Sequence, residues 1–103
     1  MSPATVELHP AAIAEARQAR LRYASQSSVA AERFMAEVER AIERVGATPL
    51  QWSPHVHGTR RISLRRFPFH LVYQVLDSDV LVLAVAHNRR RPAYWKDRAR
   101  PGI

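Results

Sequence analysis

The stretch RRISLRRFPFHLVYQVLDSDVLVLAVAH, residues 60–87, determines the fold of this chain. Apolar and polar residues alternate along residues 60–66 and again along residues 69–76, which is the pattern of strands with one buried face. Residues 80–87 are almost wholly apolar, as expected for an interior strand. Pro68 bends the chain between the first two strands because it cannot donate to a ladder. A polar Asp-Ser-Asp turn separates the last two, so the stretch predicts three consecutive antiparallel strands.

The residues before this stretch predict a short strand at residues 5–8 and then two helices. Pro10 suits the first turn of a helix, where its missing N–H breaks no hydrogen bond, and this helix is expected to end near Ser25. Its expected apolar face is Ile13, Ala16, either Ala19 or Arg20, and Tyr23. The second helix is predicted by residues spaced three and four apart, which are Ala31, Phe34, Val38, Ala41 and Val45. Gly46 is expected to cap its C-terminus.

These segments predict a single α+β domain, residues 1–103, with the order β-α-α-β-β-β and a short C-terminal helix after Pro92. The helical hairpin should cover one face of a mainly antiparallel sheet. The other face is expected to stay free. His87 and Arg89 should lie at the end of the interior strand, beside a polar and basic stripe formed by Arg61, Ser63 and Arg65.

All of the excess positive charge lies in the C-terminal part of the chain. Residues 60–100 contain nine Arg and one Lys against three Asp, a net charge of +7. Residues 1–59 contain six Arg and six Glu and are neutral. Arg binds phosphate and carboxylate through a planar fork. A basic segment that also carries His, Tyr and Trp suits a polyanion or an acidic protein as its partner.

Composition excludes several classes of site. Cysteine is absent, which excludes disulfides, thiol catalysis and zinc held by thiolates. His55 and His57 are the only close pair of histidines, and without further ligands they predict no metal site; no cofactor is expected either. No apolar run approaches the roughly 20 residues of a membrane span, and no secretory signal is visible. A cytoplasmic protein that does not bind membranes is the expectation.

Three blocks of sequence occur together in this chain. They are a Phe-x-x-x-Val-x-x-Ala segment at residues 34–41, RRFPFHLVY at residues 65–73 and AVAHNRRRPAYWKDR at residues 84–98. In combination they resemble the RelE/ParE superfamily, the toxins of type II toxin–antitoxin modules, once called plasmid stabilisation proteins. The similarity extends over roughly residues 6–98. The superfamily fold has the order of elements predicted above.

The resemblance implies a small toxin that a cognate antitoxin neutralises by wrapping it and folding on binding. RelE-like members cut mRNA in the ribosomal A site. ParE-like members poison DNA gyrase and have lost the nuclease residues. Because the fold is common to both branches, it does not decide between the ribosome with its mRNA and gyrase as the target. A non-toxic relative that only binds its antitoxin is a third alternative.

Cleavage of RNA without a metal needs a base, an acid and cations around the phosphorane. His87 is the titratable candidate, with Arg65 and Arg89 as its cationic partners. The alternative is a strand-end histidine that only hydrogen-bonds a neighbour. Tyr94 can stack on a base, whereas Trp95 is expected to pack the last turn against the sheet. The full set expected to bind phosphate or target is Arg61, Arg66, Arg90, Arg91 and Tyr94.

The sequence departs from both branches of the superfamily. Residues 59–66 lack the Lys pair that some nucleases use, and no Glu follows Glu43 to serve as the base that others use. The His-x-Arg-Arg-x-Pro-x-Tyr-Trp ending is not typical of the gyrase branch. The place of His87 in an Arg cluster with an aromatic partner favours an RNA-binding endoribonuclease that inhibits growth, with gyrase inhibition as the alternative.

Overall fold

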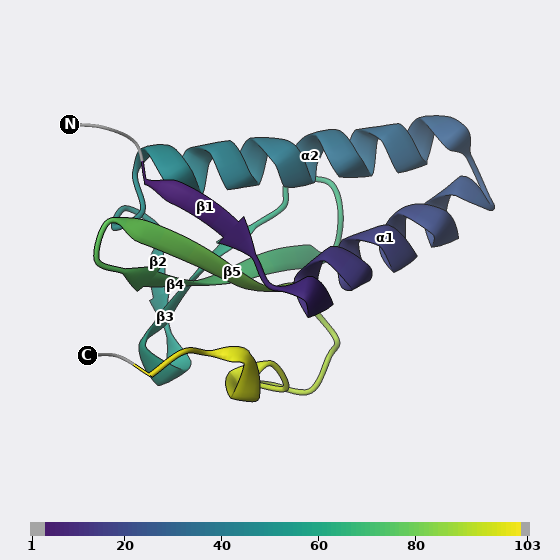
Figure 1. Ribbon diagram of the computed structural model, residues 1–103. Coiled ribbons are helices and arrows are strands. Elements are labelled where there is room, and N and C mark those ends of the chain that lie inside the picture. The colour runs from purple at the N-terminus through teal and green to yellow at the C-terminus, as the bar shows by residue number, and fades with distance from the viewer. Residues whose placement is uncertain (1–3, 102–103) are drawn as a thin grey trace.

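The computed structural model describes residues 4–101, which form a helical hairpin packed on a five-stranded sheet (Figure 1). The predicted order of elements is confirmed, and a short edge strand, β2, is added to it. A single 3-10 turn precedes β3, and another forms the short C-terminal helix at Lys96–Arg98. The helices and strands are β1 (Thr5–Leu8), α1 (Pro10–Ala24), α2 (Ser28–Ala47), β2 (Ser53–His55), β3 (Thr59–Ser63), β4 (Phe69–Leu76) and β5 (Asp79–His87).

The strands lie in the order β1-β5-β4-β3-β2. β1 is parallel to β5, and the other neighbours are antiparallel. β5 therefore has a partner on both sides, which accounts for its almost wholly apolar sequence. β3 ends at Ser63, before the predicted end at Arg66, because the chain leaves the sheet there to approach α2.

The predicted face of α2 is confirmed, since all five of its apolar residues are buried. The face predicted for α1 is partly wrong, because Ile13 is 43% exposed and the buried residues are Ala12, Ala16 and Ala19. Small side chains let α1 approach α2 and β5 closely. Within residues 4–101, neither helix combines the length and apolar character that a membrane span requires.

The prediction that Gly46 caps the C-terminus of α2 is wrong. The helix continues to Ala47, and Thr48 is the C-cap. Gly46 is buried where β1 crosses the last turn of the helix. A Cβ atom at this position would lie 3.0 Å from Cγ2 of Val6. The carbonyl of Gly46 also accepts a hydrogen bond from the N–H of Ala4 at 2.9 Å. The glycine therefore serves the close approach of β1 to α2.

The face of the sheet opposite the helices is covered, so the prediction that it stays free is wrong. Leu81, Leu83 and Val72 form a second apolar cluster there, together with Trp95, which is 1% exposed. Figure 1 shows the C-terminal segment on this side of the sheet. The predicted packing of Trp95 is confirmed. Alternate apolar residues of β5 point to both faces, and each face therefore needs a cover.

Candidate functional site

His87 ends β5 and faces the helices. Its ring lies edge-on to Phe69, with 5.0 Å between the ring centroids, and Phe69 belongs to the core beneath the helices. Nδ1 of His87 accepts a hydrogen bond from the backbone N–H of Arg89 at 3.1 Å. Within residues 4–101, Nε2 has no hydrogen-bond partner. The imidazole therefore fixes the following turn with one nitrogen and leaves the other open to a ligand.

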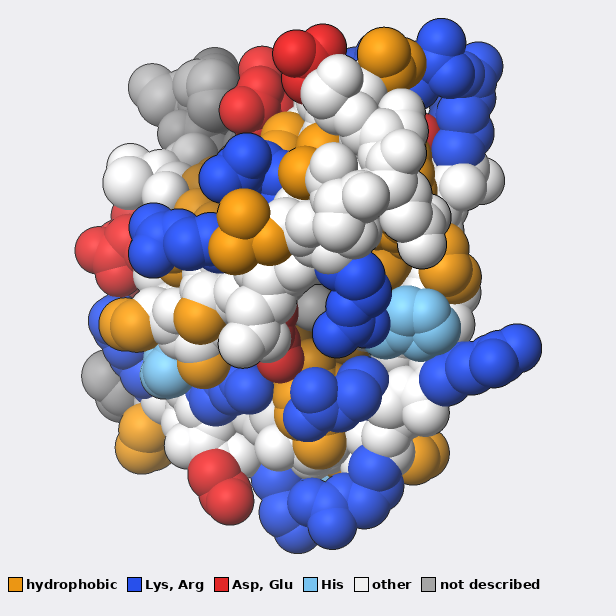
Figure 2. All heavy atoms as spheres, turned by 90° about the vertical axis from the view of Figure 1, so that its right-hand side faces the viewer, with side chains coloured by type: hydrophobic (Ala, Val, Ile, Leu, Met, Phe, Trp, Pro, Cys, Tyr) orange, Lys and Arg blue, Asp and Glu red, His pale blue; other side chains and the backbone are white. Residues whose placement is uncertain are grey.

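The turn after His87 carries three adjacent arginines, all exposed, which are Arg89, Arg90 and Arg91. Two backbone bonds fix it, one from the N–H of Asn88 to Pro68 at 2.8 Å and one from the N–H of Arg90 to His87 at 3.0 Å. We call residues 87–91 the basic turn. A hollow of about 270 Å³ adjoins it, lined by Arg22, His87, Arg89, Arg90 and Tyr94 among others. Basic side chains are spread over much of the face seen in Figure 2, with scattered acidic ones.

A carboxylate from α1 holds the C-terminal segment against the sheet. Glu15 accepts hydrogen bonds from the Tyr94 hydroxyl at 2.6 Å, from the backbone N–H of Val85 at 3.1 Å, and from both terminal nitrogens of Arg98 at 2.9 and 3.2 Å. We call Glu15, Tyr94 and Arg98 the Glu15 clamp. Burial, together with the bond to Glu15, raises the pKa of the Tyr94 hydroxyl.

The clamp also decides how Tyr94 can meet a ligand. Its hydroxyl is bound to Glu15, and the guanidinium of Arg90 lies 4.0 Å from the centroid of its ring. The predicted stacking on a base would require Arg90 to leave this position. The tyrosine thus orients an arginine of the basic turn in the structure.

Arg61 lies on the opposite face of the sheet from His87. It pairs in register with Val72, which belongs to the cluster under Trp95, whereas His87 pairs with Phe69 on the helix side. Residues opposite each other on antiparallel strands share a face. Arg61 lines a separate hollow of about 240 Å³ together with His55 and His70, and the basic turn forms part of its wall.

Two histidines of this second hollow, His55 and His70, have lowered pKa values. Nδ1 of His70 lies 2.8 Å from Oδ1 of Asn88, so the ring donates to the amide oxygen. Burial lowers the pKa of His70, and the nearby charge of Arg61 lowers it further although the Asn88 bond acts the other way. Burial and Arg61 also lower the pKa of His55. Both imidazoles are therefore uncharged at neutral pH.

Arg65 and Arg66 lie at neither of these hollows. Their backbone N–H groups donate to Oε1 of Glu37 on α2, at 2.8 and 3.2 Å. Both side chains line a third hollow, between α2 and the loop after β3. The predicted stripe along β3 does not form, because Arg65 has left the strand. Of the predicted catalytic set, the structure brings His87 and Arg89 together and places Arg65 elsewhere.

Sequence reasoning missed four polar residues that shape these hollows, namely Glu15, His70, Asn88 and Arg98. Glu15 and Arg98 lie 83 residues apart, so no local pattern connects them. His70 did carry a signal, because it is a titratable residue at an apolar position of an alternating strand. Among residues 4–101, no three His, Asp or Glu side chains are grouped as metal ligands would be.

Comparison with known proteins relates nearly the whole chain to toxin–antitoxin systems. Residues 6–92 match the sequence model of a family described as the ParE toxin of type II toxin–antitoxin systems, parDE. No curated protein matches in sequence. A chain in the structure of the chromosomal ParDE system of P. aeruginosa is similar, with a TM-score of 0.69 and 17% identity over 82% of this chain and 95% of that one.

A chain in the RelBE2 toxin–antitoxin complex of Mycobacterium tuberculosis is also similar. The TM-score is 0.58 and the identity 25%, over 84% of this chain and 93% of that one. In this chain two helices pack on a five-stranded mixed sheet, and its similarity to both structures confirms the predicted α+β fold.

Proposed function

Since this chain belongs to the family of ParE toxins of type II toxin–antitoxin systems, we propose that it inhibits DNA gyrase by binding it through the basic turn. The match over residues 6–92 makes the chain the toxin of such a module, with an antitoxin as its partner. The target and the mode of action are the proposal. It assigns inhibition to a protein contact and not to RNA cleavage.

One observation carries this proposal: the basic turn is held rigidly, but the groups beside it are poorly disposed to transfer protons. The hydroxyl of Tyr94 is bound to Glu15. Nδ1 of His87 accepts from a backbone N–H, so the neutral ring carries its proton on Nε2 and can donate but not accept there. Arg61 projects from the other face of the sheet. A binding surface, unlike a nuclease site, needs no base.

The basic turn is also well built for binding. Arg89 and Arg91 are exposed, and Arg90 is oriented by the ring of Tyr94. Arginine is enriched among the residues that dominate interface energies. Because the Glu15 clamp already orders the segment after the turn, little further conformational entropy is lost on binding. A gyrase surface rich in carboxylates, or the phosphates of the DNA bound to gyrase, would complement the positive charge of the basic turn.

The test is inhibition of DNA supercoiling by purified gyrase. Arg89→Gln with Arg91→Gln should raise the inhibitory concentration by at least about tenfold, since two arginine contacts at an interface edge are lost. The matched control is Arg17→Gln with Arg20→Gln, which removes two exposed charges from α1 and should change little. Gyrase that stays fully active at excess toxin would contradict the proposal.

Ribosome-dependent mRNA cleavage is the second candidate, and one observation favours it. The open Nε2 of His87 shares its hollow with Arg22 and Arg89, so the imidazolium form of the ring could give its Nε2 proton to a leaving oxygen near phosphate-binding cations and return to neutral imidazole. Purified programmed ribosomes with a defined mRNA would test it, comparing wild type with His87→Asn. Asparagine can still accept the bond from Arg89 but has no imidazole. Cleavage that this variant loses would replace the gyrase proposal.

A further inference from the structure

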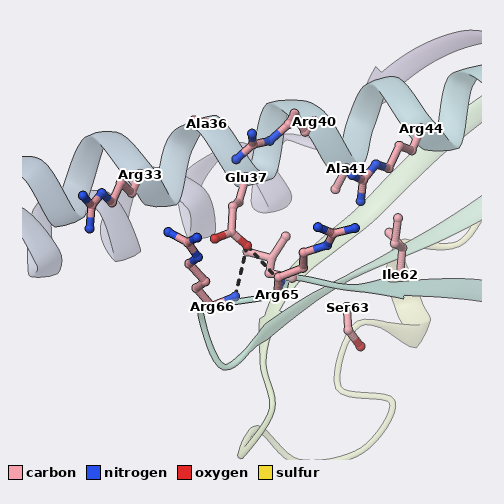
Figure 3. A pocket seen from close by; sticks show the side chains of 11 residues that line it. Arg33, Ala36, Glu37, Arg40, Ala41, Arg44, Ile62, Ser63, Arg65 and Arg66 are labelled. Carbon is pink, nitrogen blue, oxygen red and sulfur yellow. Dashed lines mark hydrogen bonds between the residues drawn. The ribbon is translucent and has the colours of Figure 1, made fainter.

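Five arginines surround a hollow that none of the functions above uses. It has a volume of about 270 Å³ and lies between α2 and the loop after β3. Arginines of α2 and of the loop after β3 project into this space (Figure 3). We call this the arginine pocket, and its five arginines are Arg33, Arg40, Arg44, Arg65 and Arg66.

The arginines of this pocket lack ionic partners in the described part of the chain. Residues 4–101 contain two ion pairs, Arg98–Glu15 and Arg100–Glu7, and both lie elsewhere. Among the described residues that line the pocket, the only carboxylate is that of Glu37, which accepts the backbone N–H groups of Arg65 and Arg66. Five cations thus face one anion that is already bound. The positive charge around the hollow is therefore largely uncompensated, and an external anion would offset it.

The lining of the pocket favours a protein anion over a nucleic acid. Its apolar part consists of Ala36, Ala41, Ile62 and Leu64, and it contains no aromatic ring. Proteins that bind unpaired bases stack them on aromatic side chains, which this pocket does not offer. An apolar floor with a guanidinium rim fits the methylene stem and carboxylate of Glu or Asp side chains, which arginine can bind with two hydrogen bonds.

We propose that the arginine pocket binds an acidic segment of the cognate antitoxin. Charge complementarity and the unpaired guanidinium groups carry the assignment, and an antitoxin is the partner that the chain's family has. The pocket shares no lining residue with the hollow at the basic turn. Binding of the antitoxin there is therefore separable from binding of the target, and the assignment does not depend on what that target is.

The first test measures the affinity of the purified toxin for its antitoxin by calorimetry. Arg40→Gln with Arg44→Gln should weaken binding at least about thirtyfold, because buried carboxylates of the partner would lose their pairs. The control Arg17→Gln with Arg20→Gln removes the same charge from α1 and should change the affinity less than about threefold. Equal weakening by both pairs, or by neither, would overturn the proposal.

A second variant, Glu37→Gln, should change the affinity for the antitoxin in the opposite direction. In Glu37→Gln the amide oxygen can still accept the N–H groups of the loop, but the negative charge in the pocket is gone. The antitoxin should then bind several times more tightly. A fluorescent single-stranded RNA serves as the competing probe. If Arg40→Gln with Arg44→Gln abolished RNA binding and spared antitoxin binding, the pocket would be a nucleic-acid site and the proposal would be wrong.

Growth assays separate this inference from the proposed function. Cells expressing Arg40→Gln with Arg44→Gln should still stop growing, and co-expressed antitoxin should no longer rescue them, whereas it should rescue cells that express the control pair. Full rescue of cells that express the pocket variant would contradict binding of the antitoxin at the arginine pocket, even if gyrase is the target. Conversely, an unaffected gyrase would remove the proposed function and leave the calorimetric result standing.

Discussion

Glu15 is the residue on which the geometry of the site depends most. Its side chain is 15% exposed and satisfies donors from β5, from Tyr94 and from Arg98, whose own side chain is 20% exposed. Removing it would leave the Tyr94 hydroxyl without its acceptor and the Arg98 guanidinium with only the carbonyl of Leu83, at 3.0 Å, which costs more than losing an exposed contact. The residue thereby couples the stability of the fold to the order of the basic turn.

Glu15→Ala should lower the free energy of unfolding by about 2–3 kcal/mol, because partly buried donors lose their acceptor. Urea denaturation followed by circular dichroism measures this. Glu7→Ala is the matched control, since Glu7 forms an exposed pair with Arg100 at 3.4 Å, and it should cost no more than about 0.5 kcal/mol. Similar costs for the two variants would show that the clamp contributes no more than a surface pair.

His70 should make the fold sensitive to acid. Its pKa in the folded state lies below the ordinary value of 6.5, so the unfolded chain binds a proton more readily. Stability is therefore complete above the unfolded pKa and falls as the pH drops below it. When the pH is lowered from about 7.5 to about 5, the urea concentration at the midpoint of unfolding should fall less for His70→Gln than for wild type. An unchanged loss would mean that other groups, such as His55, carry the effect.

Among the helices and strands, periodic patterns in the sequence predict the structure well, and errors arise where small residues determine the packing. Alternate residues of β4 belong to the two faces of the sheet as predicted, with Leu71 and Tyr73 under the helices and Val72 under Trp95, although both faces are buried. The three–four spacing of α2 also appears directly in the structure. The buried alanines of α1 give no such contrast, and Gly46 resembles a cap although it serves a close approach. Neither role can be recognised without knowing which element lies opposite.

The C-terminal segment is an element of the core without being a regular helix or strand. Trp95→Ala should lower the free energy of unfolding by about 3–5 kcal/mol, because the cluster of Val72, Leu81 and Leu83 loses its cover. Thermal denaturation of the variant measures this effect. Leu50→Ala provides the comparison, since Leu50 is 67% exposed and its loss should stay within about 0.5 kcal/mol. A small effect of Trp95→Ala would mean that packing of the C-terminal segment on the sheet contributes little to the stability of the fold.

Across the whole molecule, the net charge of +7 is divided between separate surfaces. The contiguous motif after β5 predicted the position of His87 and Arg89–Arg91, because residues directly after a strand stay together at its end. The alternation along β3 correctly placed Arg61 on the face away from the helices, but it could not predict where Arg65 lies, because β3 ends at Ser63. The arginine pocket combines residues that are distant in the sequence, and the composition alone does not reveal it.

Because the antitoxin and the target are proposed to bind at separate basic surfaces, each binding affinity should have its own dependence on salt concentration. Both the antitoxin and the proposed target should bind more weakly as ionic strength rises, because exposed charges are screened. Arg40→Gln with Arg44→Gln should reduce the slope for the antitoxin only, and Arg89→Gln with Arg91→Gln the slope for gyrase only. Calorimetry and a supercoiling assay at several salt concentrations measure the two slopes. A pair of variants that changed both slopes equally would argue for one shared surface.

Inhibition of purified DNA gyrase by the His87→Asn variant is the sharpest test of whether the basic turn binds a target or catalyses cleavage. We expect this variant to inhibit supercoiling at the same concentration as wild type, since the asparagine side chain can accept the N–H of Arg89 in place of Nδ1 and only the imidazole is lost. Arg89→Gln with Arg91→Gln, in the same assay, should need at least about tenfold more protein. Gyrase that is untouched by wild-type toxin, alongside ribosomes whose mRNA is cut only when His87 is present, would show that the turn is a nuclease site instead.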